Sequence, residues 1–386
     1  MIYLDNSATT RPLPEVVRVV SDVMENIYGN PSSLHGIGLK AERLLTQARQ
    51  IAAEQLEVAE SEIVFTSGGT EGNNLAIKGT AWQYRDRGRH LITTEVEHAS
   101  VYQVFEQLQE VGFSVTVLKP DNLGRITAKQ VEDALRDDTI LVSVMSVNNE
   151  IGTVQPIADI ARMLKSRRKT LFHVDAVQAF GKIPLPQSLE GIDLLTLSGH
   201  KFHGPKGTGV LYVRSGVSLH PLLAGGGQES SIRSGTENVP GMVGLVKAMQ
   251  TSRSELDKHR RRWGMWKQRM LERLADIPGA KLNGDRTTKG SAPHIVSVSF
   301  AGLKGEVLLH ALEEYGVYVS TKSACSSKRY VPSRVLAACG LNDAESEGTL
   351  RISMGQQTTE DDIHQALAAI EKTVHRLRRE TGVSHA

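Results

Sequence analysis

The sequence predicts an α/β protein: a mostly parallel sheet covered by helices, followed by a smaller α+β part. Between about residues 35 and 215, short apolar stretches alternate with segments of helical spacing, of which 35–56 is the first. Apolar strands separated by helices are typical of domains with parallel strands. Later in the chain, short strands and helices mix in the way expected of an α+β unit. The strands are expected at 294–300, 317–320 and 350–355, and the helices at 305–316 and 361–379.

Composition narrows the class of protein. The 386 residues fit one large domain plus a smaller one, or two comparable domains. A net charge of +2 is too close to balance to require nucleic acid or a membrane surface as a partner. Two cysteines make no disulfide framework and favour a reducing compartment. The N-terminus lacks the pattern of a signal peptide, and no apolar run is long enough to span a membrane, so we expect a cytoplasmic protein without a membrane partner.

Polar signatures follow the apolar stretches of the first part. They are Gly68-Gly69-Thr70, His98, Asn148, Asp175 and Ser198-Gly199-His200-Lys201. Ligands of parallel sheets gather at the carboxyl ends of the strands. The common placement of these residues therefore predicts one site built from several loops.

A long helical stretch is expected from about 240 to 276, with an interruption near Gly264. Its segment 259–270 is basic and contains two tryptophans, which would suit RNA or an acidic partner. We favour the alternative, a solvated helix face with Trp263 and Trp266 packed inward. Direct binding of nucleic acid is therefore not expected.

Lys201 and Asp175 form a pair with chemical meaning. A lysine at a strand end can be desolvated and act as an amine nucleophile for a Schiff base. Together with a carboxylate for a pyridinium nitrogen, it meets the minimal requirement for pyridoxal phosphate. Gln178 falls on the same side as Asp175 if a helical turn begins there, within reach of the cofactor's phenolate oxygen. The alternative for Asp175, a helix N-cap, is compatible with this role.

The turn Gly68-Gly69-Thr70 enters a helix, where backbone N–H groups and the helix dipole suit a phosphate. The alternative is a tight turn with Thr70 as the N-cap. The segment 204–209, Gly-Pro-Lys-Gly-Thr-Gly, resembles a phosphate loop but precedes a strand, so we interpret it as a turn.

Other polar residues gain weight only in combination. His98 suits a general acid–base or a group stacked on an aromatic cofactor, although a single histidine is more often structural. Arg351 suits a bidentate clamp on a substrate carboxylate, or an ordinary ion pair. His200 and His203 have no further Cys or His cluster beside them, so no metal site is expected.

The two cysteines receive opposite interpretations. Cys339 lies at the end of a predicted helix and is expected to pack in the interior. Cys325 lies among serines, with Lys322, Lys328 and Arg329 nearby, and these cations favour the thiolate. Its small polar loop would permit the sulfur to move between sites. The alternative is an incidental surface cysteine.

Taken together, these segments resemble the NifS/IscS-type cysteine desulfurases of the class V aminotransferase family. Blocks in the family's order run along nearly the whole chain. They are YLDNSATT, GNPSSLHGIG, TSGGTEGNNLAIKG, EHAS, NNEIGTVQPI, HVDAVQAFGK, SGHKFHGPKGTG, GGGQE, RSGTENV, SACSS and LRISMG. The resemblance implies the fold of the type I enzymes that use pyridoxal 5'-phosphate, with a seven-stranded sheet in the large domain, and a homodimer. It implies a large cofactor-binding domain over 15–258. A small domain, 1–14 with 259–386, would carry the catalytic cysteine loop at about 320–333.

The resemblance also implies roles for single residues. Lys201 would hold the cofactor, and His98 would stack on it and assist proton transfer. The cofactor's other contacts would be Gly69, Thr70, Asn148, Asp175, Gln178, Ser198, His200 and, from the other subunit, Thr236. Asn148 and Arg351 would bind the substrate's carboxylate. Where relatives often have further basic residues, this chain has Ser230 and Ser231, which leaves Arg233 as the phosphate or dimer contact.

The implied reaction converts L-cysteine into L-alanine and leaves a persulfide on Cys325. The loop from Cys325 to Pro332 is long, like that of the group whose loop reaches an outside acceptor, so we expect transfer to a protein partner. Iron–sulfur scaffolds, tRNA-thiolation enzymes and thiamine synthesis are the acceptors that the family supplies. A selenocysteine lyase that uses the same cofactor is one alternative, and a non-enzymatic sulfur carrier that uses only Cys325 is another.

Overall fold

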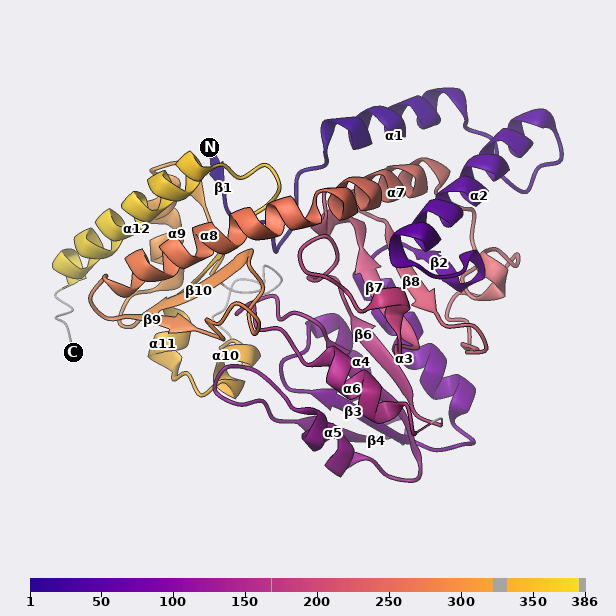
Figure 1. The fold of residues 1–386 in the computed structure, drawn as a ribbon, viewed down its shortest axis with the longest axis horizontal. Coiled ribbons are helices and arrows are strands. Elements are labelled where there is room, and N and C mark those ends of the chain that lie inside the picture. The colour runs from indigo at the N-terminus through magenta and orange to yellow at the C-terminus, as the bar shows by residue number, and fades with distance from the viewer. Residues whose placement is uncertain (168, 322–331, 382–386) are drawn as a thin grey trace.

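The computed structural model describes residues 1–167, 169–321 and 332–381. Its centre is a seven-stranded sheet in which neighbouring strands are parallel except where β8 pairs with β7 and β2 (Figure 1). The mostly parallel seven-stranded sheet of the prediction is confirmed. In spatial order the strands are β2 (Ile63–Thr66), β8 (Gly209–Val213), β7 (Leu194–Ser198), β6 (Leu171–Asp175), β5 (Thr139–Met145), β3 (His90–Thr94) and β4 (Ser114–Leu118).

Helices cover both faces of this sheet. Successive side chains of a strand point to opposite faces, so apolar residues that follow one another are buried on both sides. Phe65 and Val142 belong to one buried cluster, whereas their neighbours Val64 and Leu141 belong to another. The first cluster includes residues of α1 (Pro14–Asn26), α2 (Gly36–Leu56), α5 (Ala128–Ala134), α6 (Ile157–Leu164) and α7 (Val239–Ser254). The second includes residues of α3 (Gly69–Tyr84) and α4 (Ala99–Glu110).

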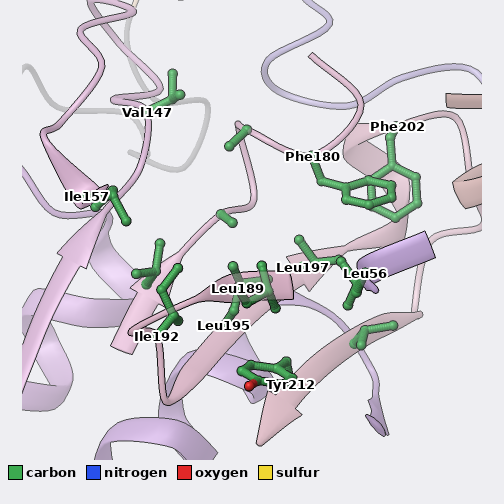
Figure 2. Packing of buried hydrophobic residues seen from close by; sticks show 14 of the residues in the cluster. Leu56, Val147, Ile157, Phe180, Leu189, Ile192, Leu195, Leu197, Phe202 and Tyr212 are labelled. Atoms are coloured by element: carbon green, nitrogen blue, oxygen red, sulfur yellow. The ribbon is translucent and has the colours of Figure 1, made fainter. Parts of the chain in front are cut away.

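An aromatic pair in the first cluster anchors two loops at the carboxyl edge of the sheet. The ring centroids of Phe180 and Phe202 lie 4.9 Å apart with the planes tilted by 60°, and both side chains are labelled in Figure 2. Phe202 follows Lys201 directly, and Phe180 lies two residues after Gln178. Burial of two phenylalanine side chains, about 2 to 3 kcal/mol each, therefore fixes the backbone that carries both candidate residues.

A second sheet lies at the other end of the molecule (Figure 1). It is antiparallel and three-stranded, with the order β12 (Thr349–Ser353), β10 (Ile295–Phe300) and β9 (Ala280–Asn283). Its cluster of buried residues includes Trp263, Phe300 and Ile352. The helices of this part are α8 (Leu256–Ala275), α9 (Gly305–Glu313), α10 (Arg334–Ala338), α11 (Asp343–Glu347) and α12 (Glu360–Thr381).

The N-terminal segment joins this second part. Strand β1 (Ile2–Tyr3) pairs in parallel with β11 (Val317–Tyr318), and Asp5 forms a bridge to Ser353. The boundary expected between 258 and 259 falls inside α8, and the division of the chain into domains stays a prediction. Within the described ranges, no helix is long and apolar enough to cross a membrane.

The long helical stretch differs in one respect from the prediction. It is interrupted at Glu255, between α7 and α8, and Gly264 lies inside α8. A Cβ atom at Gly264 would meet no neighbour, so this glycine marks an open position on the helix and not a break. Trp263 and Trp266 are buried as expected.

Candidate active site

A cavity of about 210 Å³ opens at the carboxyl ends of the strands of the large sheet. Its walls come from loops that follow several of these strands, from the N-terminal segment and from β12 of the second sheet. The residues that line it are Ser7, Ala8, Gly69, Thr70, Asn73, His98, Ser100, Met145, Val147, Asn149, Asp175, Val177, Gln178, Ser198, His200, Lys201 and Arg351. The structure thus brings together most of the residues that the sequence singled out.

Lys201 lies in the short 3₁₀ turn η3 (Gly199–Lys201) that follows β7. Its Nζ atom donates hydrogen bonds to the carbonyl oxygens of Ser7 at 2.6 Å and Ala8 at 2.8 Å. These carbonyls belong to the N-terminal segment, nearly two hundred residues away in the sequence. The amine is therefore held by neutral acceptors inside the cavity, where a group bound to it would be enclosed.

Asp175 ends β6 and is almost fully buried. The backbone N–H of Val177 donates to its Oδ1 at 3.0 Å, and Asn73 Nδ2 donates to its Oδ2 at 2.8 Å. Residues 176–180 form the turn that was expected to bring Gln178 beside it. Gln178 Nε2 donates to the carbonyl oxygen of Ser7 at 2.9 Å.

Lys182 lies beneath this turn and orients the amide of Gln178. Its Nζ donates to Gln178 Oε1 at 3.0 Å. The amide nitrogen of Gln178 therefore points away from Lys182. Lys182 is buried, and burial, together with the positive charge of Lys201, lowers its pKa.

The beginning of α3 forms one end of the cavity. Gly68 is the N-cap with φ of 143°, a conformation that favours glycine, and the helix starts at Gly69. Thr70 is therefore not the N-cap, as one alternative had it, but the second residue of the helix. A Cβ atom at Gly69 would lie 3.0 Å from a methyl group of Val177, so glycine permits the close approach of Val177.

His200 lines the cavity near Ser198 and is held at Nδ1, 3.1 Å from Thr9 Oγ1. Burial lowers the pKa of His200 to about 4, helped by the positive charges of Lys201 and Lys182. The imidazole is therefore neutral near pH 7. A neutral ring that keeps one N–H offers a hydrogen bond to an anion.

His98 is the N-cap of α4, where its Nδ1 accepts a hydrogen bond from the backbone N–H of Ser100 at 3.1 Å. The Ser100 hydroxyl lies 2.8 Å from the same nitrogen. Burial lowers the pKa of His98, Asp175 acts in the opposite direction, and Lys201 adds to the lowering. His98 thus combines the structural role and the position in the cavity that the sequence left as alternatives.

Arg351 reaches the cavity from β12. It is buried, and its guanidinium donates to Asp5 Oδ1 at 2.8 Å and to the carbonyl oxygen of Asn149 at 3.0 Å. Its backbone pairs with that of Ser320. A guanidinium has five N–H donors, so two such bonds leave capacity for a carboxylate.

The assignment of Asn148 needs correction. Its side chain is fully buried behind the cavity, where Nδ2 donates to Val96 O at 2.9 Å and Oδ1 accepts from the N–H groups of Glu150 and Ile151. These bonds use the amide to shape the loop after β5. Asn149, the next residue, lines the cavity instead.

Three expectations receive no support from the cavity of one chain. Thr236 is exposed and does not line it, and its role through a second subunit stays a prediction. Arg233 pairs with Glu71, Nε to Oε1 at 2.8 Å, which engages the side chain that we expected at a phosphate or a dimer contact. Cys325 lies outside the described residues. Cys339 is buried as expected, in a cluster with Ile151.

Some residues of the cavity escaped the sequence interpretation. Ser7 and Ala8 stand within the quoted block YLDNSATT, but they contribute backbone carbonyl oxygens, a role that no side-chain type indicates. Asn73 and Ser100 stand within the quoted blocks TSGGTEGNNLAIKG and EHAS, and Asn149 stands beside Asn148. For these three residues, the quoted block in which each one stands indicated the region of the site, but it did not indicate which residue of the block faces the cavity.

Comparison with known proteins agrees with this architecture. The family model of the class-V aminotransferases matches residues 2–366. A cysteine desulfurase IscS of Methanosarcina thermophila is 45% identical over 377 residues, which make up 98% of this chain and 93% of the relative. A NifS-like protein of known structure has a TM-score of 0.91 and 38% identity, with 97% of this chain and 99% of that chain covered. A structure described as SspA in complex with cysteine has a TM-score of 0.80 and 36% identity, with 93% and 100% covered. The chain therefore belongs to the class-V aminotransferase family of enzymes and, within it, to the NifS/IscS-type cysteine desulfurases.

Proposed function

We propose that this protein removes sulfur from L-cysteine with the help of pyridoxal 5'-phosphate, producing L-alanine and a persulfide on Cys325. The observation that carries the proposal is the convergence of the Lys201 amine, the Asp175 carboxylate and His98 in one cavity beside the first turn of α3. The relatives named as cysteine desulfurases support the same reaction.

The residues of the cavity fit this cofactor. Lys201 would be its point of attachment, and Asp175, placed by Asn73 and Val177 N–H, would bind the ring nitrogen. Gln178, oriented by Lys182, would donate to the phenolate oxygen. The phosphate would lie at the beginning of α3, where the contacts are Gly69, Thr70, Ser198 and His200. Bound there, pyridoxal phosphate supplies an electron sink for the bond to be broken.

The remaining chemistry falls to side chains of this protein. Arg351 and Asn149 would bind the substrate carboxylate at the side of the cavity that faces the second sheet. Lys201 would take the proton from the substrate Cα, and His98 would assist proton transfer. The Cys325 thiolate would attack the substrate sulfur. An S–S bond forms, the Cβ–S bond breaks, and the electron pair stays with the substrate carbon, which is protonated to give alanine.

The two cysteines provide a matched test. Purified wild type, Cys325→Ala and Cys339→Ala would be incubated with L-cysteine and a reductant, and alanine and sulfide measured. Burial raises the pKa of the Cys339 thiol to about 12, so it is inert and its removal should preserve activity. Cys325→Ala should keep the yellow cofactor and form neither product. Full activity of Cys325→Ala on L-cysteine would refute the role of its thiol.

The alternatives are separated by the same variants. Activity of Cys325→Ala on L-selenocysteine alone would indicate a selenocysteine lyase. Absence of a yellow cofactor band from wild type after addition of pyridoxal phosphate would favour a sulfur carrier.

We also propose that the protein is a cytoplasmic homodimer in which Thr236 of the second subunit completes the phosphate site, and that it passes sulfur to a protein acceptor. Light scattering tests the dimer, and Thr236→Ala tests the phosphate contact through the affinity for pyridoxal phosphate. An iron–sulfur scaffold and a tRNA-thiolation enzyme are the acceptors to be tried, with transfer of labelled sulfur as the measurement.

A further inference from the structure

Four side chains, three of them buried and that of His98 partly buried, form a continuous chain of hydrogen bonds along the wall of the cavity. Asn73 Nδ2 donates to Asp175 Oδ2 at 2.8 Å and to Ser100 Oγ at 2.9 Å. Ser100 Oγ in turn lies 2.8 Å from His98 Nδ1. The chain connects the end of β6 with the beginning of α4 through the first turns of α3.

The directions of these bonds follow from the donors available. The amino group of Asn73 has two hydrogens, one for Asp175 and one for Ser100. Ser100 Oγ accepts from Asn73. Because the backbone N–H of Ser100 donates to His98 Nδ1, that nitrogen is an acceptor, and the hydroxyl hydrogen of Ser100 is the one directed at it. The backbone N–H of Ser100 points at the same nitrogen from 3.1 Å. Since two donors meet Nδ1, the neutral ring must carry its hydrogen on Nε2.

We propose that Ser100 and Asn73 are positioning residues that fix His98 as the neutral Nε2–H tautomer and keep its ring at a set distance from Asp175. The inference deepens the proposed function, on which it rests, because it assigns the proton that His98 can give: the one on Nε2. It also assigns Asn73 two duties, since one amino group places both the carboxylate for the cofactor's ring nitrogen and the serine behind the histidine.

The charged groups that act on His98 are Asp175, which favours the imidazolium, and Lys201, which opposes it; burial opposes it most strongly. The Ser100 hydroxyl adds a donor to the nitrogen that a proton would otherwise occupy. Removal of that donor should therefore make His98 easier to protonate. A net hydrogen bond corresponds to about 0.5 to 1 pH unit in the titration midpoint.

The structure offers a matched control elsewhere in the same sheet. Ser143 Oγ on β5 lies 2.8 Å from Nδ1 of His173 on β6, and both residues are fully buried and outside the cavity lining. Ser143→Ala removes the same atom from the same kind of pair. A general effect of losing a buried hydroxyl should therefore also appear in Ser143→Ala, whereas the His98 signals should not change in that variant.

The experiment uses the full-length protein with and without pyridoxal phosphate, labelled with ¹⁵N-histidine, and records both ring nitrogens as the pH changes. The His98 signals are assigned by their loss in His98→Gln. Wild type should show a protonated Nε2 and a hydrogen-bonded, unprotonated Nδ1. In Ser100→Ala, Nδ1 should shift toward the value of an unbonded nitrogen and the midpoint should rise by the amount given above. Ser100→Thr, which keeps the hydroxyl, should restore both.

Asn73→Ala should raise the midpoint by less than Ser100→Ala does, and the part of its effect that acts through the serine should be absent when Ser100 is already replaced by alanine. Unchanged His98 signals in Ser100→Ala would overturn the proposal, as would a protonated Nδ1 in wild type. If the shifts of the midpoint caused by Asn73→Ala and Ser100→Ala are fully additive, Asn73 does not position His98 through Ser100.

Activity and the cofactor's absorbance, recorded on the same samples, keep this result apart from the proposed function. A protein that binds no cofactor and forms no alanine would refute the desulfurase, whereas unchanged nitrogen signals in an active enzyme would refute only the positioning.

Discussion

The carboxyl edge of the large sheet and the interior just behind it contain the same kinds of side chain in different situations. At the edge, His98 and Lys201 line a cavity and lie within the influence of Asp175 or backbone carbonyls. Behind it, His173 is sealed between Ser143 and Thr196, and Lys182 is buried against Gln178. Burial alone lowers the pKa of His173 to about 3, so its ring stays neutral near pH 7 and takes up no proton there.

Residue type and strand position therefore do not by themselves identify a functional side chain. Burial lowers the pKa values of histidines in both places, but only at the edge does a carboxylate oppose it and a cavity admit a ligand. The adjacent residues Asn148 and Asn149 show the same contrast one position apart, with the first engaged by the backbone and the second facing the cavity.

The largest expected effect separates the two lysines. Lys201→Ala removes the proposed attachment point and proton acceptor, so alanine formation should fall by at least about 10³-fold. Lys182→Met keeps the packing volume and should retain the yellow cofactor, with activity within about tenfold of wild type, because it acts only by orienting Gln178. Steady-state kinetics with cofactor absorbance measure both. Equal losses would erase the distinction between edge and interior.

The two asparagines should differ in what they damage. Asn148→Ala removes the partner of the Val96 carbonyl and of two backbone N–H groups, and should destabilise the fold by about 3 kcal/mol. Asn149→Ala should leave stability nearly unchanged and raise the KM for L-cysteine about tenfold. Thermal unfolding and initial rates are the two measurements. A higher KM in Asn148→Ala at unchanged stability would show that Asn148, and not Asn149, contacts the substrate.

Acid should destabilise the fold through the neutral histidines of the interior. Burial lowers the pKa of His203 and of His259 to about 4, and that of His173 further. In the unfolded chain these groups bind protons at about 6.5, before the folded protein does, so stability is complete above that pH and is lost as the pH falls toward 4.

Thermal unfolding should therefore show a midpoint that falls by at least about 4 °C between pH 6.5 and pH 4. His203 donates from Nδ1 to Arg11 O at 2.8 Å and accepts at Nε2 from Gln356 N–H at 3.2 Å, and thus requires the neutral ring. His203→Gln should reduce the slope. A midpoint that is flat over this range would contradict the assigned protonation states.

Replacement of Glu97 should have the smallest effect on stability. The stability that depends on Glu97 should fall as the pH rises, whereas that of the histidines falls as the pH drops. Burial raises the pKa of Glu97 to about 8; its Oε1 accepts from Thr94 Oγ1 and Met145 N–H, and Oε2 has no hydrogen-bond partner within the described residues. The unfolded chain releases this proton near 4.5, so stability is complete below that pH and is lost as the pH rises through 8. Glu97→Gln, which is neutral at all pH values, should raise the thermal midpoint by about 2 °C at pH 8 and leave it unchanged at pH 4. A destabilised Glu97→Gln at pH 8 would mean that the carboxylate is ionised in the fold.

Much of the fold and a good part of the site could be predicted, because the signals were local. Apolar strands with polar residues at their ends indicated the parallel sheet and the edge where the cavity lies. Asp175 and Gln178 lie within one turn of chain, and Lys201 follows its strand directly, so sequence spacing and spatial arrangement agree. The position of the break between α7 and α8 was wrong because a glycine can be accommodated inside a helix when its surroundings are open.

The strand pattern, the family and the residue types of the candidate site were all evident from the sequence. Tertiary structure alone decided which of two asparagines faces the cavity, which carbonyls receive the Lys201 amine, and that Arg233 turns to Glu71. It also decided that Asn73 joins Asp175 to Ser100 across elements far apart in the chain. The physical reason is that each of these outcomes depends on the direction of one side chain toward a partner distant in sequence, and hydrogen bonds are too short-ranged and too directional for spacing along the chain to specify them.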